Sequence, residues 1–153
     1  MFEYRCVDRY LCLGFLLSWM ALFSSAGNCH AEGLRWLRVP HNAASDARRL
    51  GRPILVYVGA NNCHYCRVMD RETWQNNRIV RQVSDEWVPL KVVAEENEVL
   101  VEKFQVSVYP TTLLFSPERK LISRLEGYFP PEALSDSLSK ARVAKRKEGA
   151  VTR

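Results

Sequence analysis

A continuous apolar run leads directly into two closely spaced cysteines, and this junction constrains the fold more than any other feature of the sequence. Residues 54–58 are all β-branched, aromatic or aliphatic, which is typical of a central strand covered on both faces. A short turn at residues 59–62 follows, and a helical pattern then begins at Cys63 and reaches Glu72. The sequence therefore predicts a strand, a turn and a helix, with the first cysteine at the helix N-terminus.

The rest of the chain alternates between helical and strand patterns. Helices are predicted at residues 34–50, 77–85 and 95–104, and a further buried strand at residues 87–93. A hairpin is predicted from the strand patterns at residues 111–115 and 120–125, and Pro130 and Pro131 open a last helix through Ala141. We therefore expect an α/β fold in which a central mixed sheet of about four strands is flanked by helices on both faces.

The composition fits one globular domain followed by a basic segment. The chain has 153 residues, of which 47% are hydrophobic and 25% charged, and its net charge is +5. Residues 140–153 hold six Lys or Arg and one Glu, so the charge belongs to a C-terminal tail that we delimit at residues 142–153. A solvated, fraying terminus is one interpretation, and attraction to an anionic membrane surface or to nucleic acid is the other. Because no nucleic-acid-binding motif accompanies the tail, we expect no nucleic-acid partner.

Residues 1–31 have the layout of an export signal. Two arginines, Arg5 and Arg9, precede an apolar run at residues 11–23, which is shorter than the ~18 residues of a spanning helix. Small residues suit a cleavage site after Ala26 or Ala31; the alternatives are an uncleaved membrane anchor and a lipidated Cys29. We expect the domain at residues 32–141 to be exported to a bacterial periplasm, or anchored in the membrane facing it.

The chemistry concentrates at residues 63–66, Cys-His-Tyr-Cys. Unpaired backbone N–H groups and the helix dipole stabilise a thiolate at a helix N-terminus, so Cys63 is the candidate nucleophile. Cys66 lies one turn further on, where it can resolve a mixed disulfide on Cys63. Protonated His64 would further favour the thiolate, but His64 could equally be an exposed residue at the rim. Residues 63–66 thus predict a redox-active dithiol that needs no other cofactor.

Two other interpretations of the cysteine pair remain open. Cys63 and Cys66 could form a structural disulfide or half of a metal site, although the sequence offers no second Cys-x-x-Cys and no close pair of histidines. The domain could also be a non-catalytic binding module that holds a protein partner or delivers copper. We predict no metal at this site.

Two segments resemble the thioredoxin superfamily. The segment ILVYVGANNCHYC, residues 54–66, is similar to the central strand and active-site turn of a thioredoxin, and VSVYPTTLLF, residues 106–115, is similar to the segment that carries the cis-proline of that fold. The resemblance implies a thioredoxin fold, a cis bond between Tyr109 and Pro110, and thiol-disulfide exchange beside Pro110 and Thr111. The run CHYCRVMDRETW, residues 63–74, is similar to an exported bacterial branch with Tyr65 as the aromatic residue between the cysteines.

Two positions depart from the thioredoxin pattern. Tyr57 stands where thioredoxin has a buried acid, and Asn62 stands where it has Trp before the first cysteine. Without the acid, the Cys66 proton must pass to water or to another group. We expect the Tyr57 hydroxyl to lie near the surface, and Trp74, Trp87 and Phe104 to be core residues.

These observations predict a thiol-disulfide oxidoreductase that acts on protein thiols and disulfides outside the cytoplasm. Its expected partners are those proteins and a membrane or thioredoxin-like electron donor. Contact with the membrane itself is expected only through an uncleaved N-terminal segment.

Overall fold

The computed structural model describes residues 33–151, with side chains up to residue 143. The predicted export signal at residues 1–31 lies outside the described residues. Among residues 33–151, no helix is both long enough and apolar enough to cross a membrane.

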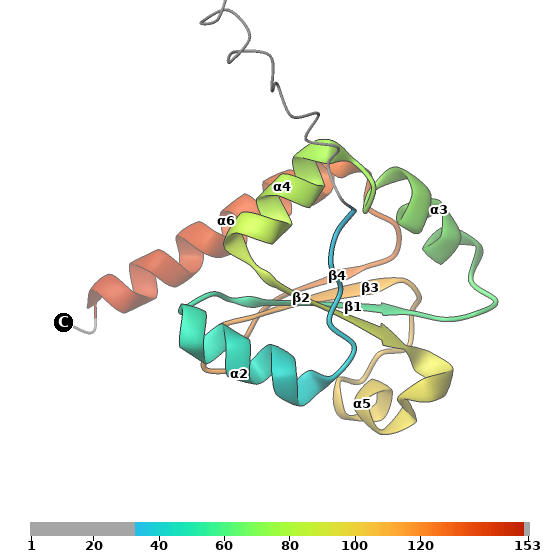
Figure 1. Ribbon diagram of the computed structural model, residues 1–153, viewed down its shortest axis with the longest axis horizontal. Coiled ribbons are helices and arrows are strands. Elements are labelled where there is room, and N and C mark those ends of the chain that lie inside the picture. Colours follow the sequence, from blue (N-terminus) through green and yellow to red (C-terminus); the bar gives the residue numbers. More distant parts are fainter. Residues whose placement is uncertain (1–32, 152–153) are drawn as a thin grey trace, which may run out of the picture. The chain divides into compact units, whose positions relative to one another are not determined.

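A four-stranded mixed sheet forms the centre of the domain, as predicted (Figure 1). Its strands are β1 (Ile54–Gly59), β2 (Val88–Val93), β3 (Thr111–Phe115) and β4 (Leu121–Glu126), in the order β2-β1-β3-β4. Strand β1 runs parallel to β2 and antiparallel to β3, and β3 pairs antiparallel with β4. All six residues of β1 are buried, as expected for a strand that is covered on both faces.

Helices cover both faces of this sheet. On one face, α2 (Pro40–Leu50) and α5 (Glu98–Lys103) pack against Ile54, Val56 and Val58 of β1. On the other face, α3 (His64–Glu72), α4 (Asn77–Glu86) and α6 (Pro131–Val151) contribute to a core with Leu55 and Tyr57. The alternation of side chains along β1 therefore divides the apolar residues into two cores.

The first helix begins later than the sequence pattern predicts. The sequence pattern predicts a helix over residues 34–50, but residues 34–39 are not helical. Pro40 occupies the first turn of α2, and Val39 before it is extended. Leu37 instead forms a parallel bridge with Leu90, accepting a hydrogen bond from Lys91 N and donating one to Pro89 O, both at 2.9 Å. This segment thereby extends the pairing at the β2 edge.

The predicted helix at residues 95–104 is also interrupted. A short 3₁₀ helix (Ala94–Glu96) comes first, and α5 begins only after Asn97. The Asn97 side chain donates a hydrogen bond to the Val93 carbonyl at 3.1 Å, a local side-chain-to-backbone bond that competes with a continuous helix.

The last helix continues beyond Ala141, so that the backbone of the basic segment is helical up to Val151. Trp74 and Trp87 are buried as predicted, whereas Phe104 is half-buried against the α2-side core.

Replacing Leu138 by Ala tests the core between α6 and the sheet. Leu138 is fully buried, so we expect the substitution to lower the free energy of unfolding by about 3 kcal/mol. The matched control is Leu121→Ala on β4, where the side chain is 51% exposed and the loss should stay below about 1 kcal/mol. Urea denaturation of the oxidised protein measures both, and equal losses would contradict this view of the core.

Candidate active site

The two cysteines form a disulfide at the start of α3. Their sulfurs are 2.10 Å apart and their Cα atoms 5.2 Å apart. Cys63 is the N-cap of α3, and its sulfur accepts a hydrogen bond from the Cys66 N–H at 3.0 Å. Cys63 is partly exposed whereas Cys66 is only 4% exposed. An incoming thiol or disulfide can therefore reach the first sulfur more easily than the second.

The register of the sheet brings the proline loop to the same end of β1. Val58 pairs with Thr111, so Pro110 lies beside Gly59, where β1 ends and the cysteine loop begins. The Tyr109–Pro110 bond is cis, as the resemblance implied. Buried Thr111 donates its hydroxyl to the Val108 carbonyl at 2.7 Å, and the Gly127 N–H donates to the Pro110 carbonyl at 2.7 Å, which fixes this loop from both sides.

The residues around Cys63 face solvent. Asn62 and His64 are exposed, and Tyr65 is 59% exposed. Tyr65 contacts the His64 ring edge-on, with ring centroids 5.4 Å apart, and stacks on Tyr128 at 6.4 Å. His64 is thus a rim residue in this structure.

The prediction that the Tyr57 hydroxyl lies near the surface is wrong. Tyr57 is fully buried, and its hydroxyl donates to the Cys66 carbonyl at 3.3 Å. Its ring packs against Trp36 and Trp74, with centroids 5.8 and 5.1 Å away. The N-terminal segment carrying Trp36, which the sequence pattern assigned to a helix, contributes to this aromatic cluster.

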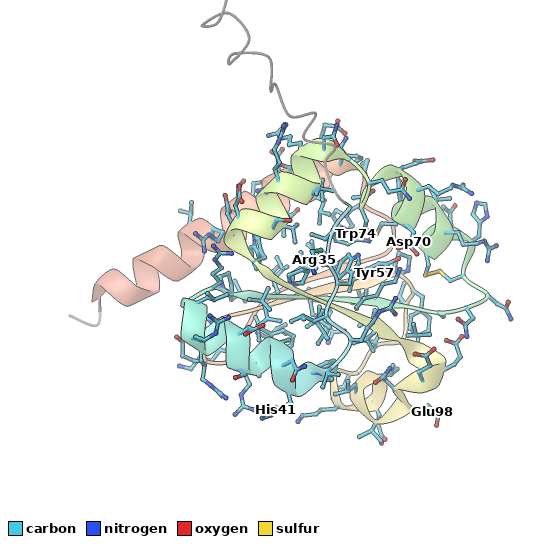
Figure 2. All side chains as sticks on the ribbon, in the orientation of Figure 1. Arg35, His41, Tyr57, Asp70, Trp74 and Glu98 are labelled. Carbon is cyan, nitrogen blue, oxygen red and sulfur yellow. A yellow bond between two sulfur atoms is a disulfide. The ribbon has the colours of Figure 1, made fainter. Side chains whose placement is uncertain are left out.

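Burial gives the Tyr57 hydroxyl a strongly raised pKa. Removal from solvent is the larger cause, and the nearby Asp70 carboxylate adds to it by disfavouring a second negative charge; the Trp74 side chain partly opposes both. Figure 2 labels Tyr57, Asp70 and Trp74 close to the disulfide at the start of α3. Tyr57 therefore remains a neutral hydrogen-bond donor at any ordinary pH.

An ion pair between Asp70 and Lys91 was not predicted from the sequence. Lys91 Nζ lies 2.7 and 2.8 Å from the two Asp70 carboxylate oxygens and 5.2 Å from the centre of the Tyr57 ring. Two signals in the sequence pointed to it: Asp70 follows Cys66 by one helical turn, and Lys91 is a charged residue within an apolar strand.

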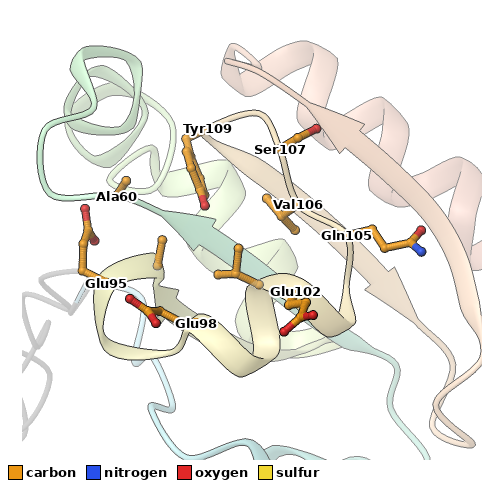
Figure 3. A pocket seen from close by; sticks show the side chains of 10 residues that line it. Ala60, Glu95, Glu98, Glu102, Gln105, Val106, Ser107 and Tyr109 are labelled. Carbon is orange, nitrogen blue, oxygen red and sulfur yellow. The ribbon is translucent and has the colours of Figure 1, made fainter.

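A groove of about 790 Å³ opens beside the proline loop (Figure 3). Glu98 and Glu102 of α5 line one wall, and Tyr109 faces them across the groove. Ala60, which follows β1, links the groove to the cysteine loop, and the Glu95 carboxylate accepts a hydrogen bond from the Asn61 N–H at 2.9 Å. Val101 and Val106 add apolar side chains to the lining of the groove.

Possible metal ligands do not cluster within the part of the chain that the structure describes. Among the residues that the structure describes, no three His, Cys, Asp or Glu side chains are placed to share a metal ion. The cysteine pair therefore has no third protein ligand within that part of the chain.

Comparison with known protein families identifies the domain. A family model described as a thioredoxin-like domain matches residues 40–142. The chain belongs to this thioredoxin-like family. The match begins at α2 and includes the whole sheet, the cysteine pair and the cis-proline.

Solved structures agree with this assignment, and the chain is also similar in sequence to curated proteins. A thioredoxin from Thermus thermophilus aligns with a TM-score of 0.65 at 25% identity, over 80% of this chain and 95% of that one. A structure titled DsbH oxidoreductase aligns with a TM-score of 0.63 at 16% identity, over 72% of this chain and 85% of that one, which shows a shared fold. Human spermatogenesis-associated protein 20 is 31% identical over 106 residues, 63% of this chain.

The thioredoxin-like chain spans only a small part of its curated relatives. It covers 13% of the length of the human protein and 15% of a Caenorhabditis elegans relative. The similarity to these proteins thus concerns one domain of much longer chains.

The raised pKa of Tyr57 predicts a loss of stability at alkaline pH. The unfolded state releases the tyrosine proton near pH 10, whereas the folded state retains it to higher pH. Between pH 9 and 11 this difference should lower the free energy of unfolding by about 1 kcal/mol, and Tyr57→Phe should lack that decrease. Urea denaturation of the oxidised protein across this range measures it, with Tyr65→Phe at the exposed rim as the control. Parallel pH curves for the wild type and Tyr57→Phe would contradict the prediction.

Proposed function

We propose that this thioredoxin-like domain is a thiol-disulfide oxidoreductase that acts on protein thiols and disulfides through Cys63 and Cys66. The observation that carries the proposal is the disulfide itself, in which the first cysteine is partly exposed at a helix N-terminus and the second is buried one turn later. A structural disulfide has no need for this asymmetry, whereas two-step exchange depends on it.

The exchange runs in two balanced steps. In the reducing direction, the Cys63 thiolate attacks one sulfur of a substrate disulfide, forms a mixed disulfide and releases the other substrate sulfur as a thiolate. The Cys66 thiol then loses its proton and attacks Cys63, which closes the Cys63–Cys66 bond and releases the second substrate thiolate. Two electrons pass to the substrate, and the reverse sequence oxidises a dithiol. The disulfide is the only redox group that this chemistry requires.

The surface beside Cys63 supports a polypeptide substrate. Tyr65, two residues after Cys63, is 59% exposed, and Val108 of the proline loop is 42% exposed. Exposed apolar side chains around an active site favour protein contacts. The groove at Tyr109 leaves room for an extended segment. Regeneration of the dithiol would come from a membrane or thioredoxin-like electron donor.

Insulin reduction by dithiothreitol tests the activity. Cys63→Ser removes the nucleophile, so the rate of insulin precipitation should fall by at least about tenfold, toward the rate without protein. Cys29→Ser is the matched control and should retain the wild-type rate, since Cys29 precedes the domain. Equal rates for the wild type and Cys63→Ser would refute the enzymatic function and favour a binding module.

Export to the periplasm is a separate part of the proposal. It is supported by the apolar run at residues 11–23, which follows two arginines and precedes a series of small residues. Expressed in a bacterium, the chain should be recovered from the periplasmic fraction and begin, by N-terminal sequencing, just after Ala26 or Ala31. Full-length protein in the cytoplasmic fraction would contradict export.

A further inference from the structure

The oxidised and reduced forms of the cysteine pair differ in charge. The disulfide is neutral, whereas a dithiol at a helix N-terminus carries about one negative charge as thiolate near neutral pH. Any fixed charge close to the sulfurs therefore favours one redox form over the other. A positive charge stabilises the reduced form, and a negative charge stabilises the disulfide.

Two opposite charges from two different elements, Lys91 of β2 and Asp70 of α3, lie beside Tyr57. Lys91 pairs with Tyr57 across the parallel strands β1 and β2, so both side chains lie on the same face of the sheet. Asp70 lies one turn after Cys66 on α3 and accepts two hydrogen bonds from Lys91 Nζ. The Asp70 and Lys91 side chains are 38% and 19% exposed, so solvent screens the pair only in part.

Close packing connects this ion pair to the Cys66 sulfur. Lys91 Nζ lies over the Tyr57 ring, and the Tyr57 hydroxyl donates a hydrogen bond to the Cys66 carbonyl. A Cβ atom on Gly59 would lie 3.7 Å from Cys66 Sγ and 3.7 Å from the Tyr57 ring, so the sulfur and the ring meet at this glycine. Since Tyr57 is fully buried and Cys66 nearly so, the intervening space is filled by protein, in which charges act more strongly than in water.

We infer that the Asp70–Lys91 ion pair beside Tyr57 sets the redox potential of the Cys63–Cys66 pair. While both charges are present, their opposite effects on the stability of the thiolate offset each other. The inference rests on the proposed function and assigns both residues a positioning role, because neither has to touch the substrate. Loss of the carboxylate leaves a cation that stabilises the thiolate and makes the disulfide easier to reduce. Loss of the ammonium leaves an anion that has the opposite effect.

Redox titration of charge variants tests this inference. Cys6, Cys12 and Cys29 are replaced by Ser in every protein, so that only the active-site pair titrates. Each protein is equilibrated at pH 8 with mixtures of reduced and oxidised glutathione, and the thiols are counted by mass after alkylation. In this reaction two glutathione thiols supply two electrons to the protein disulfide and become oxidised glutathione.

We expect shifts of opposite sign. Asp70→Asn should lower the equilibrium constant for oxidation by about threefold, and Lys91→Gln should raise it by about threefold, given partly screened charges. The double variant Asp70→Asn/Lys91→Gln should return close to the wild-type value. Lys91→Arg, which keeps the charge, should also titrate like the wild type.

A purely structural role would give a different result. If the ion pair only held α3 on the sheet, both single variants would shift the constant in the same direction and the double variant would not recover; either outcome overturns the inference and leaves the proposed function intact. Absence of any two-electron transition in the wild type would instead refute the proposed function, and the inference with it. Circular dichroism on each variant establishes that the compared proteins are folded.

Discussion

The site depends on how the buried strand β1 is paired on its two sides. Its register with β3 places Pro110 beside Gly59, and its register with β2 places Lys91 beside Tyr57. Both registers are strongly specified, because a slip by one residue would move every apolar side chain of β1 to the opposite core. The apolar pattern that stabilises the sheet therefore also fixes where the cysteine loop, the proline loop and the charged lysine meet.

The features that local patterns specify could be predicted from the sequence. Strand β3 begins and ends where the pattern of residues 111–115 predicts, and Cys63 caps a helix that ends at Glu72 as expected. Short apolar runs bounded by Gly and Pro, and a cysteine after a strand, carry enough local information for this. The order of elements and the pairing of a cysteine loop with a cis-proline followed from the same patterns and from the resemblance to thioredoxins.

Apart from the local hydrogen bond of Asn97 that interrupts the helix at residues 95–104, the failures concern contacts between distant segments. The apolar residues Leu34, Trp36 and Leu37 have helical spacing, but Leu37 bonds to the edge of β2 and Trp36 packs on Tyr57 and Trp74. A spacing rule counts apolar positions and contains no information about which surface they cover. For the same reason the burial of the Tyr57 hydroxyl could not be predicted, because it results from α3 and the N-terminal segment closing over one end of β1.

Because Tyr57 stands where thioredoxin has a buried acid, the carboxylate near the cysteine pair lies at another position in this chain. A carboxylate buried in the central strand without a partner is costly, and it would lie directly against the second cysteine. In this chain that position of β1 is Tyr57, whose ring packs on two tryptophans. Its hydroxyl donates a hydrogen bond to the Cys66 carbonyl. The carboxylate lies instead on α3, where Asp70 remains partly solvated and is neutralised by Lys91. Packing of the core and electrostatics of the cysteine pair are thereby assigned to different residues, so that the charges can vary while the aromatic cluster under α3 stays intact.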